Sequence, residues 1–380
     1  MTFRRAKMRA RTAVVAALVA ALSASLTLTS ASLAQAAPPA DPGTFVSLEP
    51  ARLLDTRVGN GAPQGPVAAY GTVGLQVTGR GGVPQTGVSA VVVNVTVTAP
   101  QTSGFVTVYP SGTAIPTASN LNFSAGLSVP NLVTVKVGAD GKINLANNSA
   151  GTADLIADVS GYYLSGVATV PGAFVSLEPS RILDTRIGTG AALTPVAPSG
   201  TVSLQVTGRG DVPADGVAAV VVNVTVTAPT AAGFLTVYPS GTDVPAASNL
   251  NFSPRQSVPN LVTVKVGADG KINLANYSTG TTELIADVAG YYLAGEATAP
   301  GAFVSLAPSR VLDTRSGTGT APWAAEAWED VSVQVAARGG VPSRGAAAVV
   351  MNVTVTQPSS GGFITVYPTA YLEPTASNLN

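Results

Sequence analysis

The sequence predicts an all-β protein made of tandem β-sandwich domains, each either a jelly roll or an Ig-like sandwich. Three observations support this. Valine and threonine are abundant, and β-branched side chains lose little rotamer freedom on a pleated sheet. The 40 glycines and 28 prolines supply turns, while charged residues are only 11% of the chain, which disfavours disorder. The same strand-like pattern also recurs every 129 residues.

The repeat is marked by a motif of arginine, two apolar residues, aspartate, threonine and arginine. It occurs at Arg52–Arg57, Arg181–Arg186 and Arg310–Arg315. We expect three β-sandwich domains at residues 38–170 (repeat 1), 171–299 (repeat 2) and 300–380 (repeat 3). Repeat 3 stops at the position matching Asn122, so the sequence predicts an incomplete domain, or a chain that is a fragment, and a unit that is unstable alone. A period this long indicates separate domains, like beads, rather than a solenoid.

Alternation within repeat 1 predicts about nine strands and no helix. Val88–Thr98 is apolar on both faces at its start, which favours a central strand. Asp140-Gly141, at the end of a four-residue turn, predicts a hairpin between the segments on either side. The predicted strands are Thr44–Leu48, Arg52–Arg57, Thr72–Thr78, Val88–Thr98, Gly104–Tyr109, Ser119–Phe123, Asn131–Val137, Lys142–Ala146 and Ala153–Leu164.

Residues 1–37 have the pattern of a secretory signal peptide. Five basic residues precede an apolar run from about Ala13 to Leu28, and Ala34-Gln35-Ala36 provides a small-residue cleavage site. An uncleaved membrane anchor is the alternative, but the apolar run is short for a membrane span. We therefore expect a secreted, extracellular protein, either free or associated with the cell wall, with no membrane span in the mature chain.

Composition excludes several functional classes. The chain has no cysteine and no histidine, so disulfides, zinc or copper sites of the Cys/His type and Ser-His-Asp or Cys-His catalysis are excluded. Without the signal segment, 15 basic residues face 20 acidic ones, which provides no electrostatic basis for binding nucleic acid. We expect no cofactor, no metal and no catalytic residue.

The repeated motif concentrates three ionisable groups in six residues. In an extended strand Arg52, Leu54 and Thr56 would share one face, and Leu53, Asp55 and Arg57 the other, so that Asp55 and Arg57 are neighbours. One interpretation is a ligand site in which arginine clamps a carboxylate or phosphate. The other, which we favour, is a partly buried ion pair that stabilises each repeat. The candidate residues are Arg52, Asp55, Arg57, Arg181, Asp184, Arg186, Arg310, Asp313 and Arg315.

Two further features have a functional and a structural interpretation. Asp55 and Asp158 could be the carboxylate pair of a glycosidase, but no other polar cluster supports that, and a structural role is favoured. The segment Pro322–Asp330 contains both tryptophans, Trp323 and Trp328. Tryptophans in a loop on a rigid β scaffold suit sugar stacking, but the interpretation that we favour is a tolerant loop that has drifted in sequence.

The ordered motifs SLEPARLLDTR, VVVNVTVT, GFVTVYPSG, SNLNF and IADVSGYY resemble a repeat of secreted, cell-surface actinobacterial proteins. The resemblance covers nearly all of residues 42–380. It implies a non-catalytic extracellular β domain, found in tandem arrays or beside secreted peptidases and glycosidases, and it provides no ligand and no catalytic residue.

The sequence thus predicts a secreted, non-catalytic tandem β-repeat protein of the cell envelope or extracellular space. Its role would be structural, adhesive or carbohydrate-binding, with cell-wall or environmental polysaccharide as partner. The alternative is the accessory region of a larger secreted peptidase or glycosidase whose catalytic domain is not in this chain. A hydrolase that uses only carboxylates is a third hypothesis.

Overall fold

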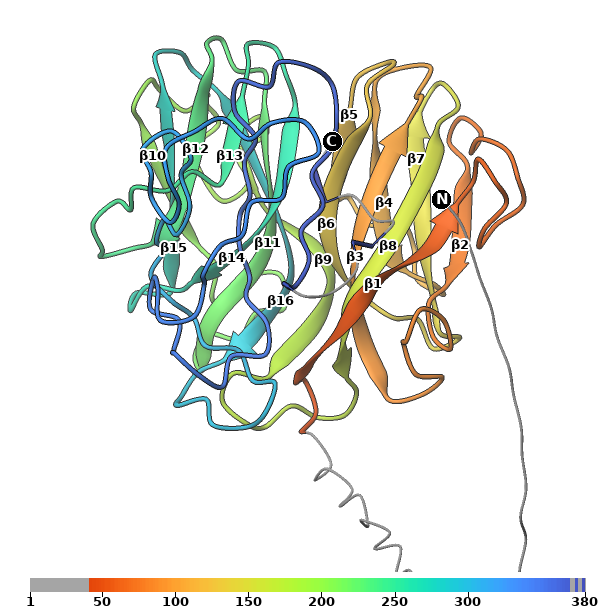
Figure 1. Cartoon of the computed structure of the whole chain (residues 1–380), viewed down its shortest axis with the longest axis horizontal. Coiled ribbons are helices and arrows are strands. Elements are labelled where there is room, and N and C mark those ends of the chain that lie inside the picture. The colour runs from red at the N-terminus through yellow and green to blue at the C-terminus, as the bar shows by residue number, and fades with distance from the viewer. Residues whose placement is uncertain (1–40, 370–372, 375–377, 380) are drawn as a thin grey trace, which may run out of the picture. The chain divides into compact units, whose positions relative to one another are not determined.

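The computed structural model describes residues 41–369, 373–374 and 378–379 (Figure 1). The predicted signal peptide, residues 1–37, lies outside them. The described residues contain no helix, hence none long and apolar enough to cross a membrane. Repeat 1 has eight strands: β1 (Phe45–Asp55), β2 (Thr72–Gln76), β3 (Val88–Thr98), β4 (Gly104–Pro110), β5 (Leu121–Phe123), β6 (Val129–Lys136), β7 (Lys142–Ser149) and β8 (Asp154–Leu164).

Repeat 2 has the same eight strands, each 129 residues later in the chain. The equal spacing follows from the sequence, because strand-forming and turn-forming residues recur without an insertion. The strands are β9 (Phe174–Asp184), β10 (Thr201–Gln205), β11 (Val217–Thr227), β12 (Gly233–Pro239), β13 (Leu250–Phe252), β14 (Val258–Lys265), β15 (Lys271–Ser278) and β16 (Glu283–Leu293).

Each of these repeats is a sandwich of two four-stranded antiparallel sheets. In repeat 1 the strand orders are β1-β8-β3-β6 and β2-β7-β4-β5; in repeat 2 they are β9-β16-β11-β14 and β10-β15-β12-β13 (Figure 1). Eight strands wound in this order between two sheets define a jelly roll. The prediction of an all-β tandem sandwich is confirmed, and the strand order selects the jelly roll over the Ig-like alternative.

The central position predicted for Val88–Thr98 agrees with the structure, in which β3 pairs with β8 on one side and β6 on the other. Val91, Val93, Val95 and Val97 are fully buried in the core between the two sheets. Complete burial of a valine stabilises the fold by about 1.5–3 kcal/mol. The opposite face of β3 is also buried, against residues of repeat 2.

The predicted count of nine strands is wrong, because the first two predicted strands are one continuous strand, β1. Its pairing with β8 shifts register twice, between Ser47 and Ala51 and between Arg52 and Leu54. Such bulges add residues to one strand without ending it, so the irregular alternation in the sequence resembles a strand break.

The predicted hairpin at Asp140-Gly141 is also wrong. The segment makes a tight turn, in which the N–H of Gly141 bonds the carbonyl of Gly138 at 2.9 Å. However, the strands that it joins, β6 and β7, belong to opposite sheets. A local turn signal specifies a change of direction, whereas the partner of each strand depends on the whole sandwich.

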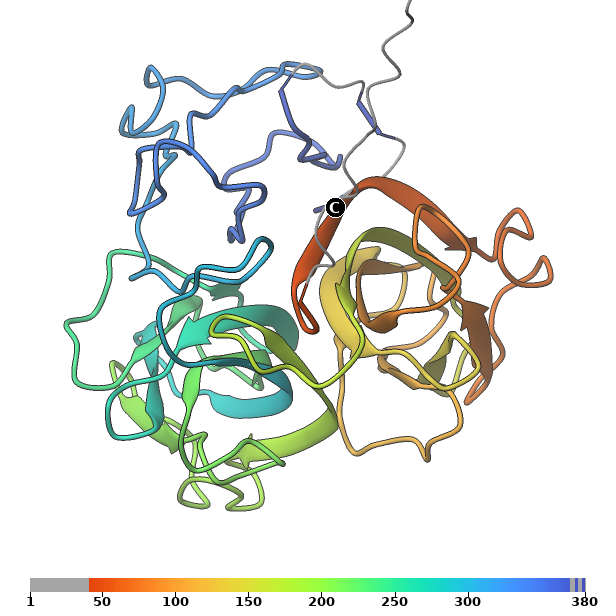
Figure 2. The same ribbon diagram turned by 90° about the horizontal axis from the view of Figure 1, so that it is seen from below.

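Repeat 3 contains no strand among its described residues and runs as a tube in Figure 2. In repeat 1, β8 lies between β1 and β3, and β7 lies between β2 and β4. This sequence has no residues in repeat 3 that match β6, β7 or β8. Only a pairing equivalent to β4–β5 remains, and the bridge between Ile364 and Leu379 is at that position. Val353 and Ile364, which match the fully buried Val95 and Val106 of repeat 1, are 38% and 40% exposed as a result.

Candidate functional site

The motif of repeat 1 lies at the end of β1, where the second register shift changes which side chains share a face. Arg52 pairs with Asp158 of the antiparallel strand β8, and Leu54 pairs with the adjacent Ala157. Leu53 therefore has no paired residue on β8. Both leucines are buried. The predicted alternation is therefore wrong at this point, and the bulge brings Arg52 to the same side as Asp55.

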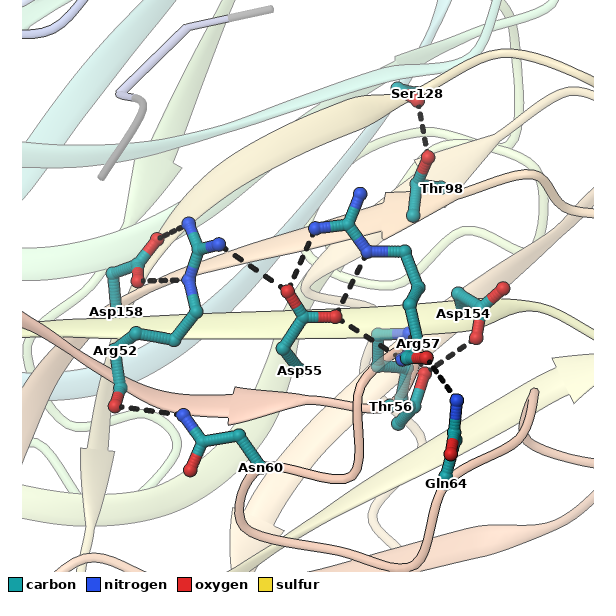
Figure 3. A network of polar contacts seen from close by, with 11 residues as sticks. Arg52, Asp55, Thr56, Arg57, Asn60, Gln64, Thr98, Ser128, Asp154 and Asp158 are labelled. Atoms are coloured by element: carbon teal, nitrogen blue, oxygen red, sulfur yellow. Dashed lines mark hydrogen bonds and ion pairs between the residues drawn. The ribbon is translucent and has the colours of Figure 1, made fainter. Parts of the chain in front are cut away.

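A continuous polar network joins the motif to β8 (Figure 3). Arg52 donates from Nε to Oδ1 of Asp158 at 2.8 Å and from Nη2 to Oδ2 at 3.2 Å. Its Nη1 lies 3.3 Å from Oδ2 of Asp55. Arg57 donates to both oxygens of Asp55, from Nε at 2.9 Å and from Nη2 at 2.7 Å. Paired bonds of this kind between guanidinium and carboxylate are strong and directional.

Repeat 2 reproduces the network closely. Arg186 donates to both oxygens of Asp184 at 2.9 and 2.7 Å, and Arg181 donates to Asp287 at 2.8 and 3.1 Å. Arg181 also lies 3.2 Å from Asp184. In each network the arginines hold a carboxylate of the motif and one from the last strand of the repeat. This arrangement connects the first and last strands of the domain.

Repeat 3 retains the local half of the network. Arg315 donates to Asp313 at 3.0 and 2.8 Å, and Arg310 donates to it at 2.8 Å. The two guanidinium groups are more exposed than those of Arg52 and Arg181. This motif is thus the most open to solvent of the three.

The charge environment holds the motif aspartates ionised. In repeat 1, the Arg57 guanidinium lowers the pKa of Asp55. In repeat 2, burial acts to raise the pKa of Asp184, but Arg186 and Arg181 outweigh burial and leave it lowered. Burial raises the pKa of Asp287, although Arg181 opposes the shift. Asp184 therefore stays ionised beside its two arginines, as expected for a member of an ion pair.

The network of repeat 2 continues into repeat 1. The backbone N–H of Ser119 donates to Oδ2 of Asp287 at 3.2 Å. Nearby, Asn131 donates to Oδ1 of Asn223 at 2.8 Å, and Asn223 donates to the carbonyl of Ser119 at 2.6 Å. All four residues are buried. The sequence indicates the importance of Asn223 only indirectly, as an asparagine that recurs in the middle of an apolar strand.

Aromatic side chains close the same junction between repeats 1 and 2. The hydroxyls of Tyr163 and Tyr292 lie 2.6 Å apart, and the ring of Phe174 packs 4.3 Å from that of Tyr163 and 5.1 Å from that of Tyr292. Burial raises the pKa of Tyr163 to about 12. The structure places these tyrosines between domains.

Backbone bonds at one recurring position link all three repeats. The N–H of Phe174 donates to the carbonyl of Gly43 at 2.7 Å, and that of Phe303 donates to Gly172 at 2.8 Å. The N–H of Phe45 donates to Gly301 at 2.9 Å, which returns the series from repeat 3 to repeat 1. Repeats 1 and 2 therefore share buried surface and repeat 3 bonds to both, so that the described residues from 41 onward form one compact unit.

The two tryptophans differ in environment. Trp323 is half-buried and donates from Nε1 to Glu329 at 3.2 Å, whereas Trp328 is 96% exposed with a φ of 66°. Tyr70 and Ser199 occupy the matching positions in the other repeats, with φ of 56° and 54°. Tyr70 is 74% exposed. Sequence reasoning missed Tyr70 because it considered only tryptophan, yet the 129-residue spacing could have identified it.

The sequence matches no family model and no curated protein. Among solved structures, it is similar to the major capsid protein P2 from bacteriophage PM2, at 11% identity, with a TM-score of 0.27 and coverage of 66% of this chain and 97% of that chain. It is also similar to the STIV MCP, at 7% identity, TM-score 0.26 and coverage of 66% and 96%. A third similar structure is the tandem CBM22 domain of Paenibacillus barcinonensis Xyn10C, at 12% identity, with a TM-score of 0.20 and coverage of 68% of this chain and 99% of that chain. These scores are low, so the fold assignment rests on the strand order.

Proposed function

We propose that the protein is a secreted, non-catalytic component of the cell envelope or extracellular space that binds carbohydrate through exposed aromatic side chains. The observation that carries this proposal is the matched pair of aromatic loop residues, Tyr70 and Trp328. Both are largely exposed, and both stand at the same position of their repeats, on a turn with a left-handed backbone. An exposed aromatic ring offers an apolar face for the C–H groups of a sugar at a low cost in conformational entropy.

The polar motif has a different part in this proposal. Its aspartates accept hydrogen bonds from arginines of the same repeat, and Asp287 also binds the backbone of repeat 1. The network joins the first and last strands of each complete repeat and so stabilises the sandwich that carries the loops. Several weak sites on one chain would strengthen attachment to a repetitive polymer through avidity.

A glycan array tests the proposal. The mature chain, labelled and applied to polysaccharides and purified peptidoglycan, is expected to be retained on at least one of them. Tyr70→Ser and Trp328→Ser together should weaken retention. Serine is a matched replacement, because Ser199 already adopts the same left-handed backbone in repeat 2. Absence of retention on every surface would refute carbohydrate binding, and unchanged retention of the double variant would refute the role of these two residues.

A further inference from the structure

A groove of about 490 Å³ lies between the outer face of repeat 2 and the motif of repeat 3. One wall is formed by β12 and β15, and a second by the loop segment from Val244 to Ser248. Arg310 and Arg315 of repeat 3 line the groove as well. Two successive repeats thus contribute chemically different side chains to one concavity.

Repeat 2 contributes an aromatic pair. Phe234 of β12 and Tyr277 of β15 are direct cross-strand partners. Their rings are stacked, with centroids 5.0 Å apart and planes 10° apart, and the two residues are 37% and 39% exposed. Asn251 of β13 is the next residue in the same row. A rigid aromatic surface with an adjacent amide can accept a sugar ring and bond its hydroxyls.

Repeat 3 contributes positive charge. Arg310 and Arg315 both bind the single carboxylate of Asp313, so the cluster carries two positive charges and one negative. No acidic residue lines the groove itself. More than half of the Arg315 side chain is exposed. Guanidinium groups bind carboxylates with paired, directional hydrogen bonds, so an acidic group on a ligand would complement this wall.

We propose that this groove binds a saccharide that bears a carboxylate, such as a uronic acid. The sugar ring packs on Phe234 and Tyr277 while its carboxylate faces Arg315. This inference rests on the proposed carbohydrate-binding function and adds to it a site and a ligand class. Repeat 1 lacks the aromatic pair, because Asn148 stands where repeat 2 has Tyr277. We therefore place the site in repeat 2 and not at the matching position of repeat 1.

Titration calorimetry with a tetrasaccharide of galacturonic acid tests the inference on the intact mature chain. We expect Tyr277→Asn to weaken binding by about tenfold. The fold should tolerate this change, since asparagine occupies the same position in repeat 1, and thermal unfolding checks that it does. Asn148→Ala is the matched control and should leave the affinity unchanged. A neutral galactose tetrasaccharide should bind at least tenfold more weakly, and only binding of the acidic ligand should fall with added salt.

Different results would contradict the location of the site, the role of the ligand carboxylate, or the whole inference. Equal affinity of the unaltered chain and Tyr277→Asn, or an equal loss in Asn148→Ala, refutes the location. Equal affinity for the acidic and neutral tetrasaccharides refutes the carboxylate. No binding of the acidic tetrasaccharide refutes the whole inference, while retention on another glycan in the array would leave the broader proposed function standing.

Discussion

Replacement of Asp184 by alanine would test the structural interpretation of the motif. Asp184 is only 1% exposed. It accepts hydrogen bonds from the backbone N–H of Arg186 at 3.1 Å and from its guanidinium at 2.9 and 2.7 Å, and Arg181 lies 3.2 Å away. Alanine would remove all of these interactions and leave two arginines facing a small cavity.

The expected loss of stability follows from the exposure of the partners. Removal of one member of a buried ion pair costs about 3–5 kcal/mol. Arg181 would keep Asp287 as a partner, and the side chain of Arg186 is 46% exposed and can turn toward water. Both facts favour the lower end of the range, about 3 kcal/mol. For a repeat of 129 residues, this loss of stability corresponds to a decrease in melting temperature of about 10 °C.

Differential scanning calorimetry of the mature chain measures the effect. Asp243→Ala is the control, because Asp243 is an exposed loop carboxylate of the same repeat, and its removal should change the melting temperature little. A melting temperature of Asp184→Ala equal to that of the control would refute the structural role. If carbohydrate binding were lost at the same time, the ligand-clamp interpretation would replace it.

Three further changes test the packing and the charges around the motif. Gly290→Ala should destabilise repeat 2 by about 1–3 kcal/mol in denaturant unfolding, because its Cβ would lie 2.3 Å from Cζ of the buried Phe174; unchanged stability would contradict this packing. Tyr292→Phe should cost about 1–3 kcal/mol by leaving the buried hydroxyl of Tyr163 unpaired, and the double variant Tyr163→Phe/Tyr292→Phe should recover part of that loss; strictly additive losses would mean that the hydroxyls do not interact. The pKa of Asp184 is lowered in the folded state, so the stability that its carboxylate contributes is present above its unfolded pKa of about 3.9 and is lost as pH falls through the folded pKa. The melting temperature should therefore fall below about pH 4, and it should fall less steeply in Asp184→Ala. Equal slopes for the two proteins would contradict the lowered pKa.

The sandwich architecture could be predicted because it depends on local patterns that recur. Val88–Thr98 is the clearest case, because a long, nearly continuous apolar run is typical of a central strand that is buried on both faces. Which strands pair with each other is harder to predict from the sequence. The turn at Asp140-Gly141 is correctly a turn, but nothing local indicates that β6 and β7 enter different sheets.

The sequence predicts which residues form the polar network, but not all of the contacts that they make. The spacing of Asp55 and Arg57 predicts that they are neighbours, and they form an ion pair at 2.7 Å. The bulge at Leu53 could not be anticipated, because it depends on the register with β8. The contact between Ser119 and Asp287 joins residues 168 positions apart in different repeats, so no pattern within one repeat contains it. Inter-repeat packing also explains why β3 is apolar on both faces.

We propose that the protein binds polysaccharide without cleaving it. Incubation of the mature chain with each polysaccharide that retains it on the array, followed by measurement of bound protein and of newly formed reducing ends, tests this most directly. We expect saturable binding that is weakened in the double variant Tyr70→Ser/Trp328→Ser, with no increase in reducing ends over time. Release of reducing ends that stops in an Asp55→Asn/Asp184→Asn variant would contradict it and would reassign the buried carboxylates to catalysis.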